Sequence, residues 1–285
     1  MADIGPIWLV NNASSGSNDD DALTALEQCC GRHGFDVARR TTFPDEDLPT
    51  PEMLDAAGID RVAVFAGDGT TNSLLARLAG WTGAVLVLPG GTMNLLYHRL
   101  HGDRDMNEVI ECAASGHSTM LRPTIIRCEY GDAYAGLLAG PGTRWGDVRE
   151  SMRKSAIVEV AGNAVAAVQE TLSGEMIVCE DPPLGRREGY PLLMMEPAES
   201  GIVVAAYHSE SAVEFLEQAV ALLKRNFREG PHEILGMPQR LRVGTIEGHP
   251  FGLLIDGEAA EAAPVTEFVL ARCEVDLIAT RLDAL

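Results

Sequence analysis

Residues 61–94, RVAVFAGDGTTNSLLARLAGWTGAVLVLPGGTMN, contain the clearest indication of the fold. The two apolar runs in this segment, VAVF at 62–65 and AVLVL at 84–88, have the continuous hydrophobicity of strands buried on both faces of a parallel sheet. Each run ends in a glycine-rich turn, and the segment between them predicts a helix that ends at Gly80. Strand, turn, helix and strand in this order predict an α/β fold.

The same alternation continues on either side of this stretch. Further strands are predicted at 7–10 and 35–41, and further helices at 21–33, 52–57, 93–100 and 106–115. We therefore expect residues 1–120 to form a doubly wound α/β domain with a parallel sheet. Ligands of such sheets bind at the carboxyl ends of the strands. Polar or glycine-rich turns are predicted at those ends, at Asn11, Gly67 and Gly90.

Beyond about Met120 the pattern changes to short strand-like runs separated by turns, which is typical of β-rich domains. Residues 121–285 are therefore predicted to form a β-rich second domain with one helix at 211–226. The last apolar stretch, FVLARCEVDLIAT at 268–280, is expected to pair within this domain, at a position that the sequence leaves open.

Composition and charge limit the function. The 285 residues carry a formal charge of −20, which argues against nucleic-acid binding because that requires clustered Lys and Arg. No run approaches the roughly 20 apolar residues of a membrane-spanning helix, and the first twelve residues lack the features of a secretory signal. None of the six cysteines forms a CxxC pair, so we expect free, buried thiols in a reducing cytoplasm.

The turn AGDGT, residues 66–70, has the chemistry of a phosphate site. Its two glycines let backbone N–H groups approach an anion, and the helix expected to begin near Thr71 adds its positive N-terminal end. Asp68 would repel phosphate directly. It indicates either an intervening metal ion or a carboxylate that orients the loop by accepting backbone hydrogen bonds. A plain Asp-Gly turn is the alternative.

Two further turns repeat parts of this chemistry. PGGTMN, residues 89–94, again joins a strand to a helix start, with Thr92 and Asn94 as uncharged hydrogen-bonding groups. Two such turns on neighbouring strands indicate a nucleotide-phosphate site more specifically than either does alone. The third turn, Asp256-Gly257-Glu258, offers carboxylates that can take a hydroxyl proton or share a metal; a simple Asp-Gly hairpin turn is its alternative.

AGDGTTN, PGGTMN and the late IDGE, in this order, resemble the motifs of the diacylglycerol kinase-like lipid kinases. That family includes bacterial lipid kinases, sphingosine kinases and ceramide kinases. The resemblance covers nearly the whole chain in architecture and is specific in the three motifs. It implies an N-terminal nucleotide-binding α/β domain, a C-terminal β-sandwich and Mg²⁺-dependent transfer of phosphate from ATP to a lipid hydroxyl.

The resemblance also implies roles for individual residues. Asp256 matches the general base, and Glu258 is expected close to the nucleotide and metal. The implied metal ligands are Asp68 and Glu199; the latter lies in PAESG, residues 197–201, where the family usually supplies two adjacent aspartates. The implied nucleotide-binding residues are Asn11, Thr41, Gly67, Asp68, Gly69, Thr70, Asn72, Gly90, Gly91, Thr92, Asn94 and Glu258.

Several motif positions depart from the family pattern. Ala66 replaces a glycine, Asn12 replaces a proline, and acidic residues are replaced by Ser73, Leu95 and Ser200. Two alternatives to a lipid kinase therefore stay open: a nucleotide-binding protein without catalysis, and a kinase for a soluble hydroxyl compound such as NAD. For the lipid kinase we expect ATP and Mg²⁺ as cofactors, a lipid substrate, and a cytoplasmic protein that contacts the membrane transiently; a homodimer is left open.

Overall fold

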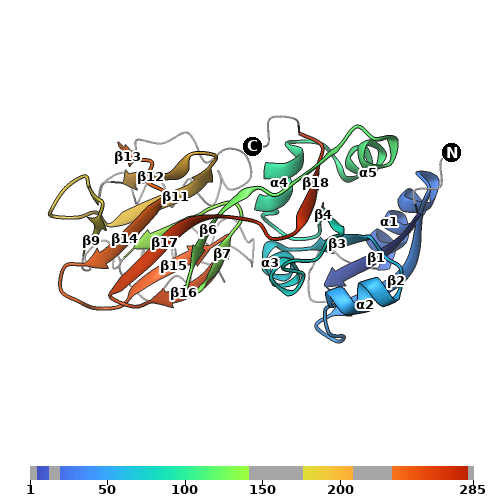
Figure 1. Ribbon diagram of the computed structural model, residues 1–285, viewed down its shortest axis with the longest axis horizontal. Helices are drawn as coiled ribbons and strands as arrows, with labels where there is room; N and C mark the ends of the chain where they lie inside the picture. The colour runs from blue at the N-terminus through green and yellow to red at the C-terminus, as the bar shows by residue number, and fades with distance from the viewer. Residues whose placement is uncertain (1–4, 13–19, 141–175, 208–232, 282–285) are drawn as a thin grey trace. The chain divides into compact units, whose positions relative to one another are not determined.

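Residues 5–12, 20–140, 176–207 and 233–281 are described by the computed structural model, which separates into two units (Figure 1). The first unit comprises Met1–Pro123 and Arg272–Leu285, and the second comprises Thr124–Ala271. The helix predicted at 211–226 lies outside the described residues.

The first unit contains a six-stranded sheet of order β2-β1-β3-β4-β18-β5, in which all strands but β5 run parallel. The buried apolar runs become the neighbouring strands β1, β3 and β4, which confirms the predicted α/β class (Figure 1). The strands are β1 (Gly5–Asn12), β2 (Phe35–Phe43), β3 (Arg61–Ala66), β4 (Ala84–Pro89), β5 (Thr119–Leu121) and β18 (Asp276–Ala279). The helices are α1 (Asp20–Arg32), α2 (Pro51–Ala56), α3 (Asp68–Arg77), α4 (Leu95–His101) and α5 (Met106–Ser115).

Helix α3 begins earlier than the sequence indicated, at Asp68 instead of near Thr71. Gly67 is its N-cap residue, and the amide of Thr71 donates to the Gly67 carbonyl at 3.0 Å. The glycine-rich turn is therefore folded into the first helical turn, where backbone N–H groups have no acceptor within the helix.

The C-terminal strand differs from the prediction. Residues 268–280 were expected to pair within the second domain, but only β17 (Val265–Arg272) does so. The chain then returns to the first unit, where β18 lies between β4 and β5. Leu277 is fully buried there, and Ile278 is nearly so, because the apolar side chains of β18 complete the sheet beyond β4. The predicted division into two continuous domains, 1–120 and 121–285, does not allow for this return of the chain to the first unit.

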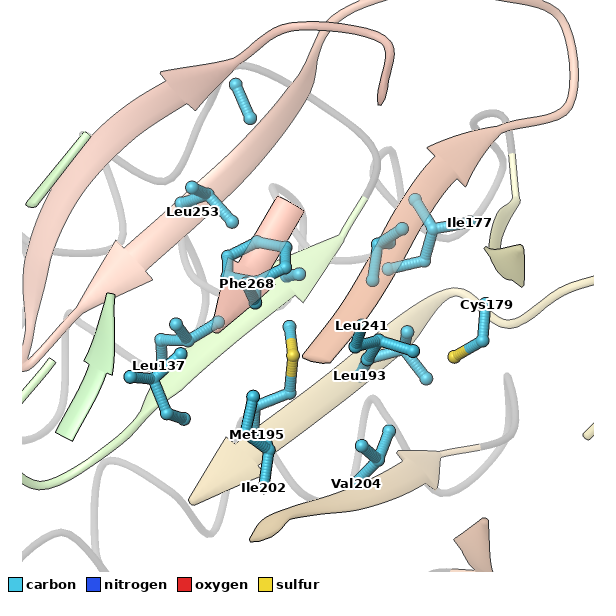
Figure 2. Close-up of a cluster of buried hydrophobic side chains, with 14 of the residues drawn as sticks. Leu137, Ile177, Cys179, Leu193, Met195, Ile202, Val204, Leu241, Leu253 and Phe268 are labelled. Atoms are coloured by element: carbon cyan, nitrogen blue, oxygen red, sulfur yellow. The ribbon is translucent and has the colours of Figure 1, made fainter. Parts of the chain in front are cut away.

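The second unit consists of two six-stranded sheets, ordered β10-β9-β14-β17-β6-β7 and β13-β12-β11-β8-β15-β16. Side chains of both sheets, such as Phe268 and Leu241 from the first and Met195 and Leu253 from the second, pack in one buried cluster (Figure 2). The unit is therefore a β-sandwich, as predicted. Its other strands are β6 (Thr124–Cys128), β7 (Gly131–Ala133), β8 (Leu137–Gly140), β9 (Ile177–Asp181), β10 (Pro183–Leu184), β11 (Leu192–Ala198), β12 (Gly201–Tyr207), β13 (Glu233–Gly236), β14 (Arg240–Thr245), β15 (Phe251–Ile255) and β16 (Glu258–Ala262).

All six cysteines are free thiols, as predicted, but only four of them are buried: Cys112 and Cys128 are partly exposed. Burial raises the pKa of the Cys30 and Cys179 thiols to about 12, so both are inert as nucleophiles at neutral pH. Across the described parts of the chain, no helix combines the length and apolarity needed to cross a membrane.

Candidate functional site

The predicted turns meet at one edge of the first sheet. In the strand registers Asn11 lies opposite Phe65, and Ala66 lies opposite Pro89, so β1, β3 and β4 end side by side. The strand order reverses between β1 and β3, and such switch points are where open α/β sheets bind ligands. Three segments of separate sequence position thus form one candidate site.

The two glycine-rich turns are in direct backbone contact. The amide of Gly90 donates to the Ala66 carbonyl at 3.2 Å. A Cβ atom on Gly90 would lie 2.5 Å from the Ala66 nitrogen, and one on Gly91 would lie 2.5 Å from Gly67 Cα. Only glycine fits at these two positions, because the close approach leaves no room for a side chain.

Asp68 joins the starts of two helices. Its Oδ1 atom accepts a hydrogen bond from the amide of Leu96, in the first turn of α4, at 3.2 Å. The carboxylate also lies in the first turn of α3, where negative charge is favourable. Of the two explanations that the sequence offered for Asp68, the orienting role is the one seen in these contacts; a role as metal ligand stays a prediction.

Asn94 closes the second turn. Its backbone is left-handed, with φ 53° and ψ 45°. Its Oδ1 atom accepts from the Gly91 amide at 2.8 Å, and its Nδ2 atom donates to the Gly91 carbonyl at 2.9 Å. The side-chain amide of Asn94, which was predicted to contact the nucleotide, therefore holds its own loop together. Thr92, between Gly91 and Asn94 in the sequence, is exposed.

The β1–β2 side of the site is a row of buried polar groups. Asn11 and Thr41 are 1% and 5% exposed. The Thr42 hydroxyl donates to Asn11 Oδ1 at 3.2 Å, and the Trp8 indole donates to the Thr41 hydroxyl at 2.9 Å. The Thr41 hydroxyl is thus held by Trp8 of the neighbouring strand β1. Thr42 was not singled out from the sequence, and no local pattern marks it.

Asn12 connects this row to the first glycine turn. Its Nδ2 atom donates to the hydroxyl oxygen of Thr70, in the first turn of α3, at 2.7 Å. Asn72, in the same helix, is partly exposed, and its amide oxygen is buried. Asn12 and Thr70 are 58 residues apart, so no local sequence pattern predicts this hydrogen bond.

The segments that form this edge carry no basic side chain. Residues 11–12, 41–42, 66–72 and 89–94 contain neither Lys nor Arg. A phosphate bound by these segments would be neutralised by backbone N–H dipoles and by a cation that arrives with it. This donor set suits a nucleotide–metal complex better than a bare anion, because Mg²⁺ is usually held by substrate phosphates and one or two carboxylates.

His101, at the end of α4, contacts the strand that precedes the second turn. The ring is fully buried, with Nδ1 3.0 Å from the Thr280 hydroxyl oxygen and Nε2 3.2 Å from the Val87 carbonyl oxygen. Burial lowers the pKa of His101 to about 4, so the imidazole is neutral at pH 7. Its role is to fasten α4 to β4 and to the residue after β18.

Asp256 belongs to the second unit, where it follows β15. Its carboxylate accepts hydrogen bonds from the amides of Tyr134, Ala135 and Gly136 at 2.7–2.9 Å. The residue is 2% exposed and has a left-handed backbone, with φ 46°. The IDGE turn is therefore locked onto the segment between β7 and β8 by charge-assisted bonds. Glu258 pairs with Ile255 across the same turn and is partly exposed.

The turn that contains Glu199 is held by contacts within the second unit, and a role of Glu199 as a metal ligand stays a prediction. Ala198 pairs with Gly201, so Glu199 and Ser200 form the tip of the β11–β12 hairpin. The Ser200 hydroxyl donates to the Met237 sulfur at 3.1 Å. In the described parts of the chain, no group of three His, Cys, Asp or Glu side chains gathers here or elsewhere. The hairpin tip therefore contacts the thioether of Met237, just after β13, which is a poor ligand for a hard cation.

Comparisons with known proteins agree with this division of the chain. Residues 6–123 match the model of the diacylglycerol kinase catalytic domain, and the match ends where the first unit's N-terminal segment ends. No curated protein sequence matches the chain.

Three solved structures from Bacillus anthracis str. Sterne share the fold. One, a diacylglycerol kinase, is 13% identical, with a TM-score of 0.59 over 98% of both chains. The other two, assigned to the same kind of kinase, are each 14% identical. Their TM-scores are 0.61, over 98% of this chain and 99% of the other, and 0.60, over 96% and 97%. At these identities the similarity establishes the fold.

Proposed function

We propose that this chain transfers the terminal phosphate of ATP to the hydroxyl of a lipid, because residues 6–123 match the model of the diacylglycerol kinase catalytic domain. The observation that supports this most directly is the edge of the first sheet, where two glycine turns touch through their backbones at a topological switch point.

The phosphates of ATP would bind across the two turns. The amides of the first turn of α3 point toward that edge of the sheet and favour negative charge. The hydroxyls of Thr70 and Thr92 add uncharged donors from either turn. Mg²⁺, when bound with ATP, supplies the positive charge that these segments lack, with Asp68 as its candidate ligand.

In the proposed reaction the lipid hydroxyl oxygen forms a bond to the γ-phosphorus of ATP while the bond to the ADP oxygen breaks. The hydroxyl proton passes to a carboxylate, for which Asp256 is our candidate. Its three backbone hydrogen bonds fix the direction of the carboxylate within the second unit. Glu258, on the same turn, is our candidate for the acidic group near the nucleotide.

One observation favours a second candidate function, nucleotide binding without catalysis. The same three hydrogen bonds give Asp256 a sufficient structural role as the lock of its turn. The two functions make different predictions for turnover and for nucleotide binding, so a single set of assays separates them.

The experiment measures Mg²⁺-dependent ATP consumption with micelles that contain diacylglycerol, sphingoid bases or phospholipids. Unaltered protein is compared with Asp256→Asn and with Glu267→Gln, which removes an exposed carboxylate paired with Arg240 in the same unit. We expect turnover on one lipid class, a fall of roughly two to four orders of magnitude in Asp256→Asn, and no change in the control. Stabilisation by ATP without turnover on any lipid would favour the second candidate.

Asp256→Asn must also be tested for folding. The Asn side chain places an NH₂ group near backbone N–H donors, so the turn loses at least one hydrogen bond. We expect its unfolding free energy to fall by roughly 1–3 kcal/mol. A loss of turnover in protein that is still folded at the assay temperature, and that still binds ATP, is the result that supports the base.

A further inference from the structure

Three hydroxyl side chains lie close together at the start of α3, and they are used differently. Thr71 and Ser73 donate to the carbonyls of Gly67 and Gly69, at 3.0 and 2.9 Å, as hydroxyls in helices commonly do. Thr70 makes no such bond within the described residues. Its hydroxyl oxygen instead accepts a hydrogen bond from Asn12 Nδ2 at 2.7 Å, from the end of the neighbouring strand β1.

The direction of this bond determines what the Thr70 hydroxyl can do next. A hydroxyl has one proton to donate and lone pairs to accept. Because Asn12 supplies the proton of the bond between them, the proton of Thr70 is turned away from Asn12. No described residue accepts it. Thr70 is only 7% exposed, so few orientations are open to its hydroxyl.

We propose that Asn12 is a positioning residue, which fixes the Thr70 hydroxyl as a donor to a nucleotide phosphate at the start of α3. This inference rests on the proposed function, because it takes the phosphate of ATP as the acceptor. Asn12 itself acts through Thr70. Asn11, next to it, is already the acceptor of the Thr42 hydroxyl, so the two adjacent asparagines hold different neighbours.

The hydrogen bond from Asn12 to Thr70 also connects the end of β1 to the first turn of α3 across the switch point.

The test is a double-mutant cycle on binding, with MgATP and adenosine as the two probes. Asn12→Ala removes the donor, Thr70→Val removes the hydroxyl with little change of shape, and the double variant removes both. Asn107→Ala, an exposed asparagine in α5, is the matched control. Dissociation constants are measured by calorimetry at one salt concentration, and each variant is first melted to establish that it is folded.

We expect Asn12→Ala and Thr70→Val each to weaken MgATP binding by about three- to tenfold. Adenosine has no phosphate, so its affinity should not change. The double variant should bind MgATP no more weakly than Thr70→Val alone, because Asn12 acts only through the hydroxyl. A structural role alone would lower both affinities together and would not give this coupling.

Three results would overturn the inference. If unaltered protein binds MgATP but Asn12→Ala binds it equally well, or if the two losses add in full, Asn12 does not act through Thr70, and the proposed function is untouched. If unaltered protein does not bind MgATP at all, the proposed function fails and this inference fails with it.

Discussion

Gly91 is the position where the fold and the proposed phosphate site are most tightly linked. A Cβ atom there lies 2.5 Å from Gly67 Cα, whereas non-bonded carbon atoms prefer about 3.5–4.0 Å. Gly91→Ala must therefore separate the two turns by roughly 1 Å. The atom in the way belongs to the backbone, so no side-chain rotation relieves the contact. We expect the unfolding free energy to fall by roughly 1–3 kcal/mol, as for other overpacked sites.

The effect on function should exceed the effect on stability. The turns on either side of this contact form the proposed cradle of the ATP phosphates, and a misplacement of about 1 Å at a reacting centre costs on the order of 100-fold in rate. We therefore expect Gly91→Ala to lose turnover by roughly that factor. Its stabilisation by MgATP in a thermal unfolding assay should shrink as well, because that stabilisation follows the ligand's affinity.

Two other glycines provide controls for this variant. A Cβ atom on Gly67 meets Gly91 Cα at 3.5 Å, an ordinary contact, so Gly67→Ala should lose less stability than Gly91→Ala, with only the weaker N-cap of α3 to lower it. Gly31, in α1, has nothing within 4 Å, and Gly31→Ala should stabilise the protein by roughly 0.5–1 kcal/mol. A Gly91→Ala protein that melts and binds MgATP like the unaltered protein would contradict this prediction, because the two turns would then not depend on their contact.

Three further predictions follow from individual contacts. Asp68→Leu removes the acceptor of the Leu96 amide and should cost roughly 1–3 kcal/mol in urea unfolding, whereas Asp68→Asn keeps an acceptor and should cost less; equal losses would contradict the orienting role. The pKa of His101 is lowered to about 4 in the fold, so the unfolded chain binds the extra proton between pH 6.5 and 4. The stability that the neutral His101 ring contributes is thus complete above about pH 6.5, and roughly 3 kcal/mol of it is lost as the pH falls toward 4. The unfolding free energy of His101→Gln should therefore depend less on pH in this range. Chelation by EDTA should leave the thermal unfolding midpoint unchanged, because the tip of the Glu199 hairpin contacts the Met237 thioether. A large drop in the midpoint would indicate that a structural metal ion is bound at this hairpin.

The parts of this fold that could be predicted from sequence are those that short segments decide. The apolar runs at 62–65 and 84–88 are continuous because β3 and β4 are covered on both faces, and a glycine turn follows each strand. The meeting of the two turns followed from the general geometry of parallel sheets. Even the two explanations of Asp68 came from local chemistry, and the structure shows the contact that one of them requires.

The parts that could not be predicted depend on contacts between distant residues. An amide at Asn94 is equally suited to a phosphate and to its own loop, and only the left-handed backbone at that residue directs it to Gly91. Asn12 and Thr70 are 58 residues apart. The periodicity of residues 276–279 indicates a buried strand but does not say which sheet edge receives it. Competition between edges is decided by tertiary packing.

The return of the C-terminal segment changes what the family match means for this chain. The match covers residues 6–123, but the first unit also needs 272–281, since β18 separates β4 from β5 in its sheet. The second glycine turn lies between β4 and α4, and both are fastened to this segment. His101 joins Val87 to Thr280, and the amide of Thr280 donates to the Leu100 carbonyl at 3.2 Å. The loop proposed to hold ATP is therefore supported by segments that lie far apart in the sequence, so residues 6–123 alone do not make up the first unit.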